Sequence, residues 1–324
     1  MGFLQALFGG KEESPEEKEK KKNERDFDVL KYDGIRARRI GEFGYATKCF
    51  KQALAIQEDN EILGYLAECL MLSGEKEEGY NTYLKLVELN PHDPKYLLFL
   101  AQLEESRMNY NKMEEFCEAA LKIDSENATA IYLSARARYL QKDELRAIIL
   151  LTQAITKNEN LTEAYQLRAD ILEKMDCLKD AEESLEPMME KEDTPEEIMI
   201  RKANLCLKQG KTEEAITYYN KVKEKNPMYR PAYIGLSTAY SINKQLDLSL
   251  DTLNDVLEFM PDFAEGFKER GRIKLMLNDK EGAAEDLKKA LEINPKTFKN
   301  IDGKFSNIET EMTEQYKSRN PFGF

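Results

Sequence analysis

Apolar and small residues recur along most of the chain with the spacing of amphipathic helices. In each of eight segments, a large apolar residue is followed four positions later by Gly, Ala or Ser. The large residues are Leu30, Leu63, Leu97, Ile131, Tyr165, Met199, Tyr233 and Phe267, and the small ones are Gly34, Ala67, Ala101, Ala135, Ala169, Ala203, Ser237 and Gly271. Positions four apart lie one turn apart on the same helix face. The pattern therefore predicts a helix with a projecting side chain beside a notch in every segment.

A second series of small residues keeps step with the first and predicts a second helix in each segment. Its members are Ala46, Gly79, Met113, Ala147, Ala181, Ala215, Ser249 and Ala283, of which only Met113 is large. The first step is 33 residues and the other six are 34. A helix–turn–helix unit of this length marks a helical solenoid. The sequence predicts an all-α array over residues 27–297, with eight repeats that begin near residues 27, 60, 94, 128, 162, 196, 230 and 264.

Proline marks several repeat boundaries, but Pro187 falls inside the predicted second helix of the fifth repeat. An interior proline removes one backbone hydrogen bond and clashes with the preceding turn. We expect a kink or an early end of this helix, and the junction after it is the predicted hinge of the array.

This pattern resembles that of the tetratricopeptide repeat (TPR) family over about residues 27–297. The last repeat carries the family pattern in Phe267, Gly271, Ala283, Leu287, Ala290 and Pro295. The chain departs from it in having no tryptophan, and in the polar residues Glu104, Arg138 and Lys274 at a usually aromatic place. The resemblance implies a right-handed superhelical solenoid. It also implies that the first helix of each repeat (the A helix) lines a concave groove that binds other proteins, and that the second (the B helix) faces outward.

The segments outside the repeats have distinct compositions. Residues 1–26 are predicted to form a flexible or loosely helical N-terminal arm, because residues 11–26 carry six basic and seven acidic side chains and nothing to bury. Apolar residues at steps of 3 and 4 over residues 298–318 predict a capping helix that would cover the last repeat. Residues 319–324 form a tail, either disordered or recognised by a partner or by the groove of another copy.

The first ten residues contain no charged side chain, and Phe3, Leu4, Leu7 and Phe8 could form one apolar face of a short helix. Three alternatives remain open for this segment: a disordered tail, a tail docked on the chain itself, or weak contact with a membrane surface.

Little in the chain supports catalysis or metal chemistry. The five cysteines form no CxxC pair, and the single histidine, His92, lies in a loop. There is no nucleophile elbow, P-loop or HExxH motif. We therefore expect a non-enzymatic protein without cofactor or metal. No apolar run is long enough to span a bilayer, so no stable membrane insertion is expected and the predicted location is cytoplasmic.

Charge is distributed unevenly between the two helices of a repeat. The whole chain carries −13, but the first 14 residues of the eight repeats together carry +5, which leaves −18 elsewhere. The negative total argues against a general nucleic-acid binder, and RNA binding by the inner wall is the less favoured alternative. A mildly positive groove favours an acidic peptide or a C-terminal carboxylate as ligand.

The sharpest candidate binding patch is the A helix of the fourth repeat. Residues 128–142 contain no acidic side chain, and Tyr132, Arg136 and Tyr139 share one face. Arginine between two tyrosines can bind a carboxylate while the rings cover an apolar side chain. The alternative is that these residues pack against the third repeat or lie in water. Neighbouring repeats place Leu98, Gln102, Gln166, Asp170, Ile200, Asn204 and Thr238 at equivalent positions, and Lys268 and Arg272 at the far end of the groove.

Some TPR proteins hold the acidic tails of heat-shock chaperones with lysine and asparagine at set places of three successive repeats. Lys31 matches the first lysine, but Ile35 and Tyr65 stand at asparagine places. Asn204 matches alone, and Gly235 breaks its set. The sequence therefore argues against that role. It predicts a scaffold or adaptor that holds a peptide or helix of another protein, with a self-assembling component of a larger complex, built from copies of this chain, as the alternative.

Overall fold

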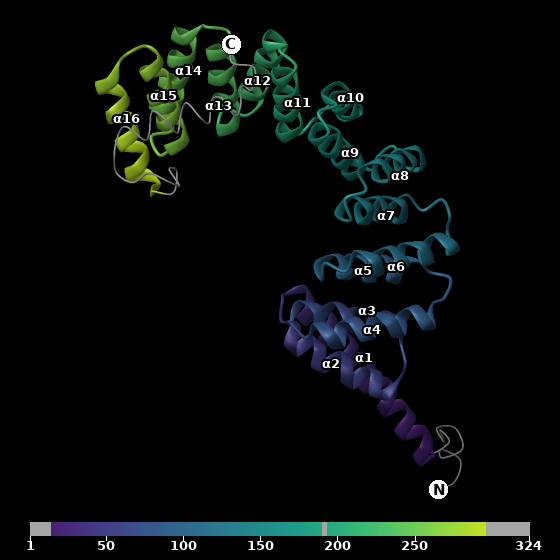
Figure 1. Ribbon diagram of the computed structural model, residues 1–324. Helices are drawn as coiled ribbons and strands as arrows, with labels where there is room; N and C mark the ends of the chain where they lie inside the picture. The colour runs from purple at the N-terminus through teal and green to yellow at the C-terminus, as the bar shows by residue number, and fades with distance from the viewer. Residues whose placement is uncertain (1–13, 190–192, 296–324) are drawn as a thin grey trace, which may run out of the picture. The chain divides into compact units, whose positions relative to one another are not determined.

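The computed structural model describes residues 14–189 and 193–295, and the regular structure in these ranges is entirely α-helical (Figure 1). Its sixteen helices are α1 (Pro15–Arg39), α2 (Phe43–Ile56), α3 (Asn60–Leu72), α4 (Lys76–Leu89), α5 (Lys95–Ser106), α6 (Tyr110–Ile123), α7 (Ala128–Leu140), α8 (Glu144–Lys157), α9 (Thr162–Lys174), α10 (Leu178–Met189), α11 (Glu196–Lys208), α12 (Thr212–Lys225), α13 (Arg230–Ile242), α14 (Leu246–Phe259), α15 (Ala264–Met276) and α16 (Lys280–Ile293). Odd-numbered helices are the A helices and even-numbered ones the B helices. The expected all-α solenoid of eight helix–turn–helix repeats is confirmed.

The repeats form two compact units, residues 1–164 and residues 165–324, here called the N-terminal and C-terminal units. The division falls in the first turn of α9, so each unit holds four repeats. Within each unit, a B helix packs both on its own A helix and on the A helix of the next repeat. Successive A helices also touch, as α5 does α7 and α13 does α15. The A helices therefore lie along the inner side of each stack.

Small residues at the helix crossings allow this close approach. Ala46, Ala67 and Ala101 are fully buried. At Gly34 an added Cβ would lie 2.5 Å from a ring carbon of Phe50, which is itself fully buried. The notch predicted in α1 thus receives a large side chain from the adjacent B helix, and at Gly271 of α15 the side chain of Leu287 takes the same place.

One residue in each A–B turn has left-handed backbone geometry, with φ between 59° and 91°. These residues are Gly41, Gly74, Met108, Lys142, Asp176, Gly210, Lys244 and Asn278. Only glycine adopts this conformation without steric cost, and asparagine and aspartate tolerate it better than other residues. Glycine occupies three of these turns, and the same turn recurs where the sequence has methionine or lysine.

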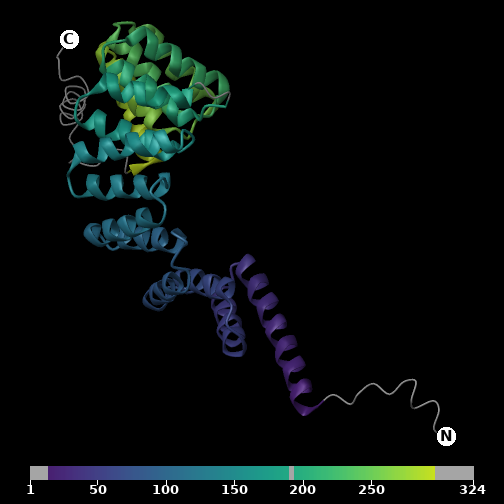
Figure 2. The same ribbon diagram turned by 90° about the vertical axis from the view of Figure 1, so that its right-hand side faces the viewer.

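The first repeat differs from the expectation for the N-terminal arm. Residues 15–26, expected to be flexible or loosely helical, are the first half of the 25-residue helix α1, which extends beyond its partner α2 (Figures 1 and 2). Ser14 caps the helix: its hydroxyl accepts the Glu17 N–H, and the Glu17 carboxylate accepts the Ser14 N–H. This capping box and a proline in the first turn start the helix before its buried face begins at Phe27.

Helix α10 continues through Pro187 to Met189. The hydroxyl of Thr194 donates to the carbonyl oxygens of Met188, at 3.1 Å, and of Met189, at 3.4 Å. These bonds satisfy carbonyl groups that the end of a helix leaves open. Residues 1–13, the predicted capping helix at 298–318 and the tail at 319–324 lie outside the described residues.

Candidate functional site

Two of the predicted groove residues, Leu98 and Gln102, line an open cleft of about 410 Å³ on the A-helix side of the N-terminal unit. The cleft lies between α5 and the start of α7. Its lining residues are Asp93, Pro94, Lys95, Leu98, Phe99, Gln102, Asn127 and Thr129, and it is called the repeat-3 cleft below. The sequence had not singled out Lys95, Phe99, Asn127 or Thr129, although Lys95 and Phe99 lie one turn from the two residues that it had.

Neighbouring contacts fix the walls of the repeat-3 cleft. The ring of Phe99 remains 39% exposed and stacks on Tyr83, with centroids 5.5 Å apart. The ammonium of Lys95 lies 5.6 Å from the centre of the Tyr96 ring. Asn127 caps α7 by accepting the N–H of Ala130 at 3.0 Å. The cleft therefore combines an apolar wall with a cation and amide groups, which suits an apolar side chain flanked by hydrogen-bonding groups.

Tyr132, Arg136 and Tyr139, called the fourth-repeat patch below, lie on α7, the helix whose start lines the cleft. Arg136 Nε lies 2.8 Å from Glu105 Oε1 on α5, so the A helices of the third and fourth repeats are joined by an ion pair. Burial raises the pKa of Tyr132, and the positive charge of Arg136 offsets part of that rise. Tyr139 is half-buried on the same helix. The sequence found Arg136 but missed Glu105, the carboxylate already beside it.

The predicted residues of the C-terminal unit lie on four successive A helices, and several already have partners. Arg201 pairs with Asp170 and donates to the carbonyl of Gln166 at 3.3 Å. Asn204 Oδ1 accepts the hydroxyl of the fully buried Tyr219 at 2.6 Å. Ile200 packs beside Met199 and Val222, and the hydroxyl of Thr238 donates to the carbonyl oxygen of Ile234. On α15, Lys268 is half-buried and Arg272 pairs with Glu269.

Several basic side chains of the A helices pair with carboxylates of a neighbouring A helix or of the loop before it. Lys31 lies 2.9 Å from Asp59 and 3.1 Å from Glu61, and Arg38 pairs with Glu68. With the pairs of Arg136 and Arg201, these contacts link consecutive repeats. Of the carboxylates in these pairs, only Asp59 lies outside the stretches that gave the A-helix total of +5. The pairing therefore leaves that total almost unchanged and shows where its charges lie.

Glu104, Arg138 and Lys274 stand at a position that is usually aromatic in the TPR family. In this chain each of them forms an ion pair. Glu104 is buried and accepts Arg107 at 3.2 Å. Arg138 pairs with Glu114 of the preceding B helix, and Lys274 lies 2.9 Å from Asp286. Buried charges are tolerated where they are paired in this way.

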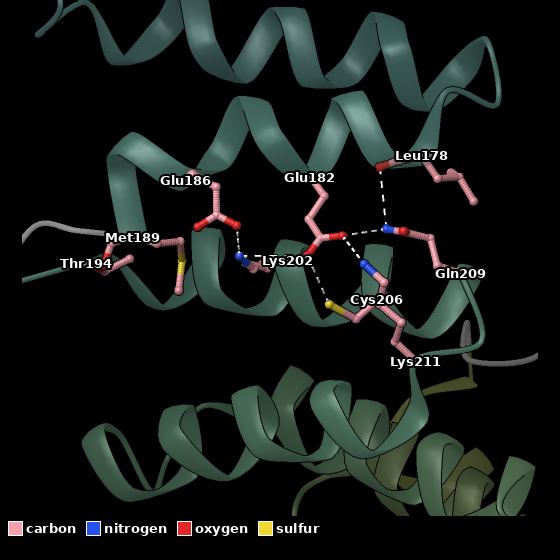
Figure 3. A network of polar contacts seen from close by, with 9 residues as sticks. All are labelled: Leu178, Glu182, Glu186, Met189, Thr194, Lys202, Cys206, Gln209 and Lys211. Atoms are coloured by element: carbon pink, nitrogen blue, oxygen red, sulfur yellow. Dashed lines mark hydrogen bonds and ion pairs between the residues drawn. The ribbon is translucent and has the colours of Figure 1, made fainter.

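A polar network joins α10 to α11 in the C-terminal unit (Figure 3). Lys202, only 3% exposed, pairs with Glu186 and lies 3.8 Å from Glu182. Glu182 is itself buried and also accepts Gln209 at 2.7 Å and Lys211 at 2.8 Å. The sequence did not mark this network. Leucine stands at the place of Lys202 in three repeats, but the other four have Asp33, Ser134, Arg168 and Arg270 there.

The same network spans the junction after Pro187, where a hinge was expected. Lys225 adds a bond to Asp193 at 2.6 Å and one to the Thr194 carbonyl at 2.8 Å. The compact units divide about a repeat earlier, between Ala164 and Tyr165. Contacts across the α10–α11 junction thus oppose the bending that Pro187 alone had suggested.

The network predicts a defined acid sensitivity. Burial alone would raise the pKa of Glu182, but hydrogen bonds from Lys211 and Gln209 and nearby positive charges hold it below its usual value near 4.5. A lowered pKa contributes stability above the unfolded-state pKa, and this contribution is lost as the pH falls through the folded-state pKa. We expect the urea concentration at the midpoint of unfolding of the C-terminal unit to decrease as the pH is lowered past about 4.5. In the Glu182→Gln variant this decrease should be smaller, because the titrating carboxyl is absent. Circular dichroism at pH 7, 5, 4 and 3 checks it; identical pH profiles would contradict it.

Three potential ligand atoms, from Glu182, Cys206 and Glu214, lie within 4.8 Å of one another. Glu182 is already bound by Lys211 and Gln209. Burial raises the pKa of the Cys206 thiol to about 12, so it stays protonated near neutral pH, and the thiolate is the form that binds metals. This arrangement fits a structural contact better than a metal centre.

Among the helices of the described residues, none is both long enough and apolar enough to cross a lipid bilayer.

Comparison with known proteins gives two family matches. A family profile described as "Tetratricopeptide repeat protein 21 ARM repeat" matches residues 91–247, and a "Tetratricopeptide repeat" profile matches residues 269–297. The chain is also similar to Hsp70-Hsp90 organizing protein 2 of Arabidopsis thaliana, with 20% identity over 238 residues. That match covers 70% of this chain and spans 40% of the length of the relative.

Solved structures show the same fold at low identity. The C-terminal part of a TPR repeat-containing protein from Cytophaga hutchinsonii aligns with a TM-score of 0.61 and 14% identity, over 74% of this chain and 98% of that one. The pilF protein of Pseudomonas aeruginosa aligns with a TM-score of 0.51 and 14% identity, over 65% and 96%. Together with the register of eight helical hairpins, these matches show that the chain belongs to the tetratricopeptide repeat family.

Proposed function

We propose that this TPR scaffold for protein–protein interaction is a non-enzymatic adaptor that binds a peptide or helix of another protein on its A-helix side. The observation that carries the proposal is the repeat-3 cleft, where Leu98 and Gln102 lie together with the exposed ring of Phe99. An apolar side chain of the ligand would enter beside Leu98 and Phe99. Its neighbouring polar groups would bond to Gln102 and Lys95.

The proposed ligand is acidic or ends in a carboxylate. Lys95 in the cleft and Arg136 in the adjoining patch are the cations best placed for it, and Arg136 remains 42% exposed beside Glu105. The expected location is the cytoplasm, where five free cysteines stay reduced.

The name of the Arabidopsis relative points to Hsp70 and Hsp90. We do not propose chaperone tails as ligands of this chain. Lys31, which matches one place of the family's chaperone-binding set, is already held by Asp59 and Glu61, and the asparagine places nearby hold other residues.

Affinity capture with two inner-side variants tests the proposal. Lys95→Glu with Gln102→Trp reverses charge and fills the cleft, and Arg136→Glu with Tyr139→Ala disrupts the patch. We expect each to reduce capture of a specific partner about tenfold, the effect of losing a central contact. The matched control is Lys122→Glu with Gln153→Trp. It makes the same two types of substitution at exposed positions of B helices.

A partner that all variants retain equally would contradict binding on this side. The acidic preference is tested separately with a peptide from the captured partner. Binding is titrated at two salt concentrations, before and after its Asp and Glu are replaced by Asn and Gln. Equal affinities would remove the acidic preference and leave the cleft proposal standing.

A further inference from the structure

A second open cleft, of about 390 Å³, lies on the first repeat and is distinct from the proposed ligand site. Val29 and Leu30 of α1 and Ala55 and Ile56 of α2 supply its apolar lining, and Asp26 and Gln52 supply its polar part. Val29 is 51% exposed and Ile56 is 37% exposed. It is called the first-repeat cleft below.

Comparison with the later repeats of the N-terminal unit shows what this surface lacks. Ile62, at the place equivalent to Val29, is fully buried, and Leu63, at the place of Leu30, is 8% exposed. Each lies on an A helix that packs against the B helix of the preceding repeat, as α3 packs against α2. The α1 side of the first-repeat cleft is therefore the place where a preceding apolar helix would pack. On the α2 side, Ile56 is about as exposed as its equivalents Leu89, at 44%, and Ile123, at 36%.

We propose that residues 3–8 of this chain occupy the first-repeat cleft and cap the end of the helical stack. Phe3, Leu4, Leu7 and Phe8 give this segment an apolar face at helical spacing, and residues 1–10 carry no charged side chain. An exposed solenoid end is normally covered by a capping element. The first half of α1 offers no alternative surface, since residues 15–26 are exposed and mostly charged.

The length of the connecting chain fits this arrangement. Asp26 lies 12 residues after Ser14, which is about 18 Å along α1. The six residue steps from Phe8 to Ser14 can cover about 20 Å when extended. Phe8 thus reaches the level of Asp26, and residues 3–7 run on over Val29 and Ile56, antiparallel to α1. Gly9 and Gly10 permit the change of direction between the docked segment and the connection.

Tryptophan fluorescence tests the proposal directly, because the chain has no tryptophan of its own. In the full chain carrying Phe8→Trp, we expect blue-shifted emission and weak quenching by acrylamide. Adding Val29→Asp and Ile56→Asp should shift the emission to the red and raise quenching severalfold. Both aspartates replace exposed side chains, so the fold should survive, and circular dichroism verifies it. Leu145→Asp, at a 66% exposed position of α8 in the same unit, is the matched control and should leave the emission unchanged.

Several results would overturn the proposal. Red-shifted, strongly quenched emission in the Phe8→Trp chain would show that the segment is in water. A blue shift that is unchanged by Val29→Asp with Ile56→Asp would show that residues 3–8 are buried at another place. A blue shift that grows with protein concentration would assign the cleft to a second copy. A blue shift seen only with vesicles of phosphatidylcholine and phosphatidylserine would assign the segment to a membrane surface.

Discussion

Replacing Gly235 by alanine is expected to destabilise the C-terminal unit by about 2–3 kcal/mol. An added Cβ would lie 2.2 Å from Cε1 and 2.5 Å from Cζ of Tyr219. That ring is fully buried, and its hydroxyl is held by Asn204 at 2.6 Å, so it has little room to move. Helix propensity alone predicts the opposite sign, since alanine is favoured over glycine inside a helix by about 1 kcal/mol. Urea unfolding and hydrogen exchange of α12 and α13 measure the effect.

Gly64→Ala is the matched control, because Gly64 also lies inside an A helix. Its added Cβ would meet only the Tyr96 hydroxyl, at 3.8 Å, an ordinary contact. We expect this change to be neutral or stabilising by up to about 1 kcal/mol. Tyr219→Leu should partly rescue Gly235→Ala by removing the ring, which a double-mutant cycle would show as coupling. If Gly235→Ala were as harmless as Gly64→Ala, the packing between α12 and α13 would be wrong.

Replacing Glu182 by alanine is expected to cost about 3 kcal/mol, the typical result of removing one member of a buried ion-pair network. Lys202 would lose its second carboxylate while remaining 3% exposed, and Gln209 and Lys211 would lose their acceptor (Figure 3). Exposed salt bridges contribute far less, because water already solvates both charges. The expected readout is a lower urea midpoint, with faster hydrogen exchange concentrated in α10 and α11.

Glu183→Ala is the matched control for Glu182→Ala, because it removes the same charge from an exposed position. Glu183 is the next residue on α10, is 61% exposed at its side chain, and lies 3.7 Å from Lys179 on the same helix. We expect a change of under about 0.5 kcal/mol. Equal effects for Glu182→Ala and Glu183→Ala would show that the network contributes no more than general surface charge.

The local sequence pattern predicts the repeats well because each repeat touches only its neighbours. The notch at Gly34 could be placed on one face of its helix from spacing alone, and the structure shows that Phe50 of α2 fills it. The start of α1 was missed, although its signal was present as Ser14, Pro15 and Glu17. The mixed-charge composition had indicated a flexible or loosely helical arm, because a segment with no apolar residues gives no helical periodicity.

The candidate site could be predicted only in part. Leu98 and Gln102 followed from their equivalence to Tyr132 and Arg136 in the next repeat, and both line the repeat-3 cleft. The pair between Arg136 and Glu105 could not be read from one helix. It depends on how two A helices are offset, and that offset is set by packing between repeats.

The sequence by itself determined the all-α class, the number of repeats, and which face of each helix is buried, because these follow from periodicity within about one helical turn. Only the tertiary structure decided which charges meet: Lys202 with Glu186, Arg201 with Asp170 and Arg136 with Glu105. It also decided that Lys244 and Met108 take the left-handed turn that glycine takes elsewhere. The physical reason is the same in both cases. Packing of the A helix on the B helix within a repeat, and of one repeat on the next, fixes the positions of whole helices. A turn residue or a side chain then adopts the conformation that this position imposes, whatever its own preference.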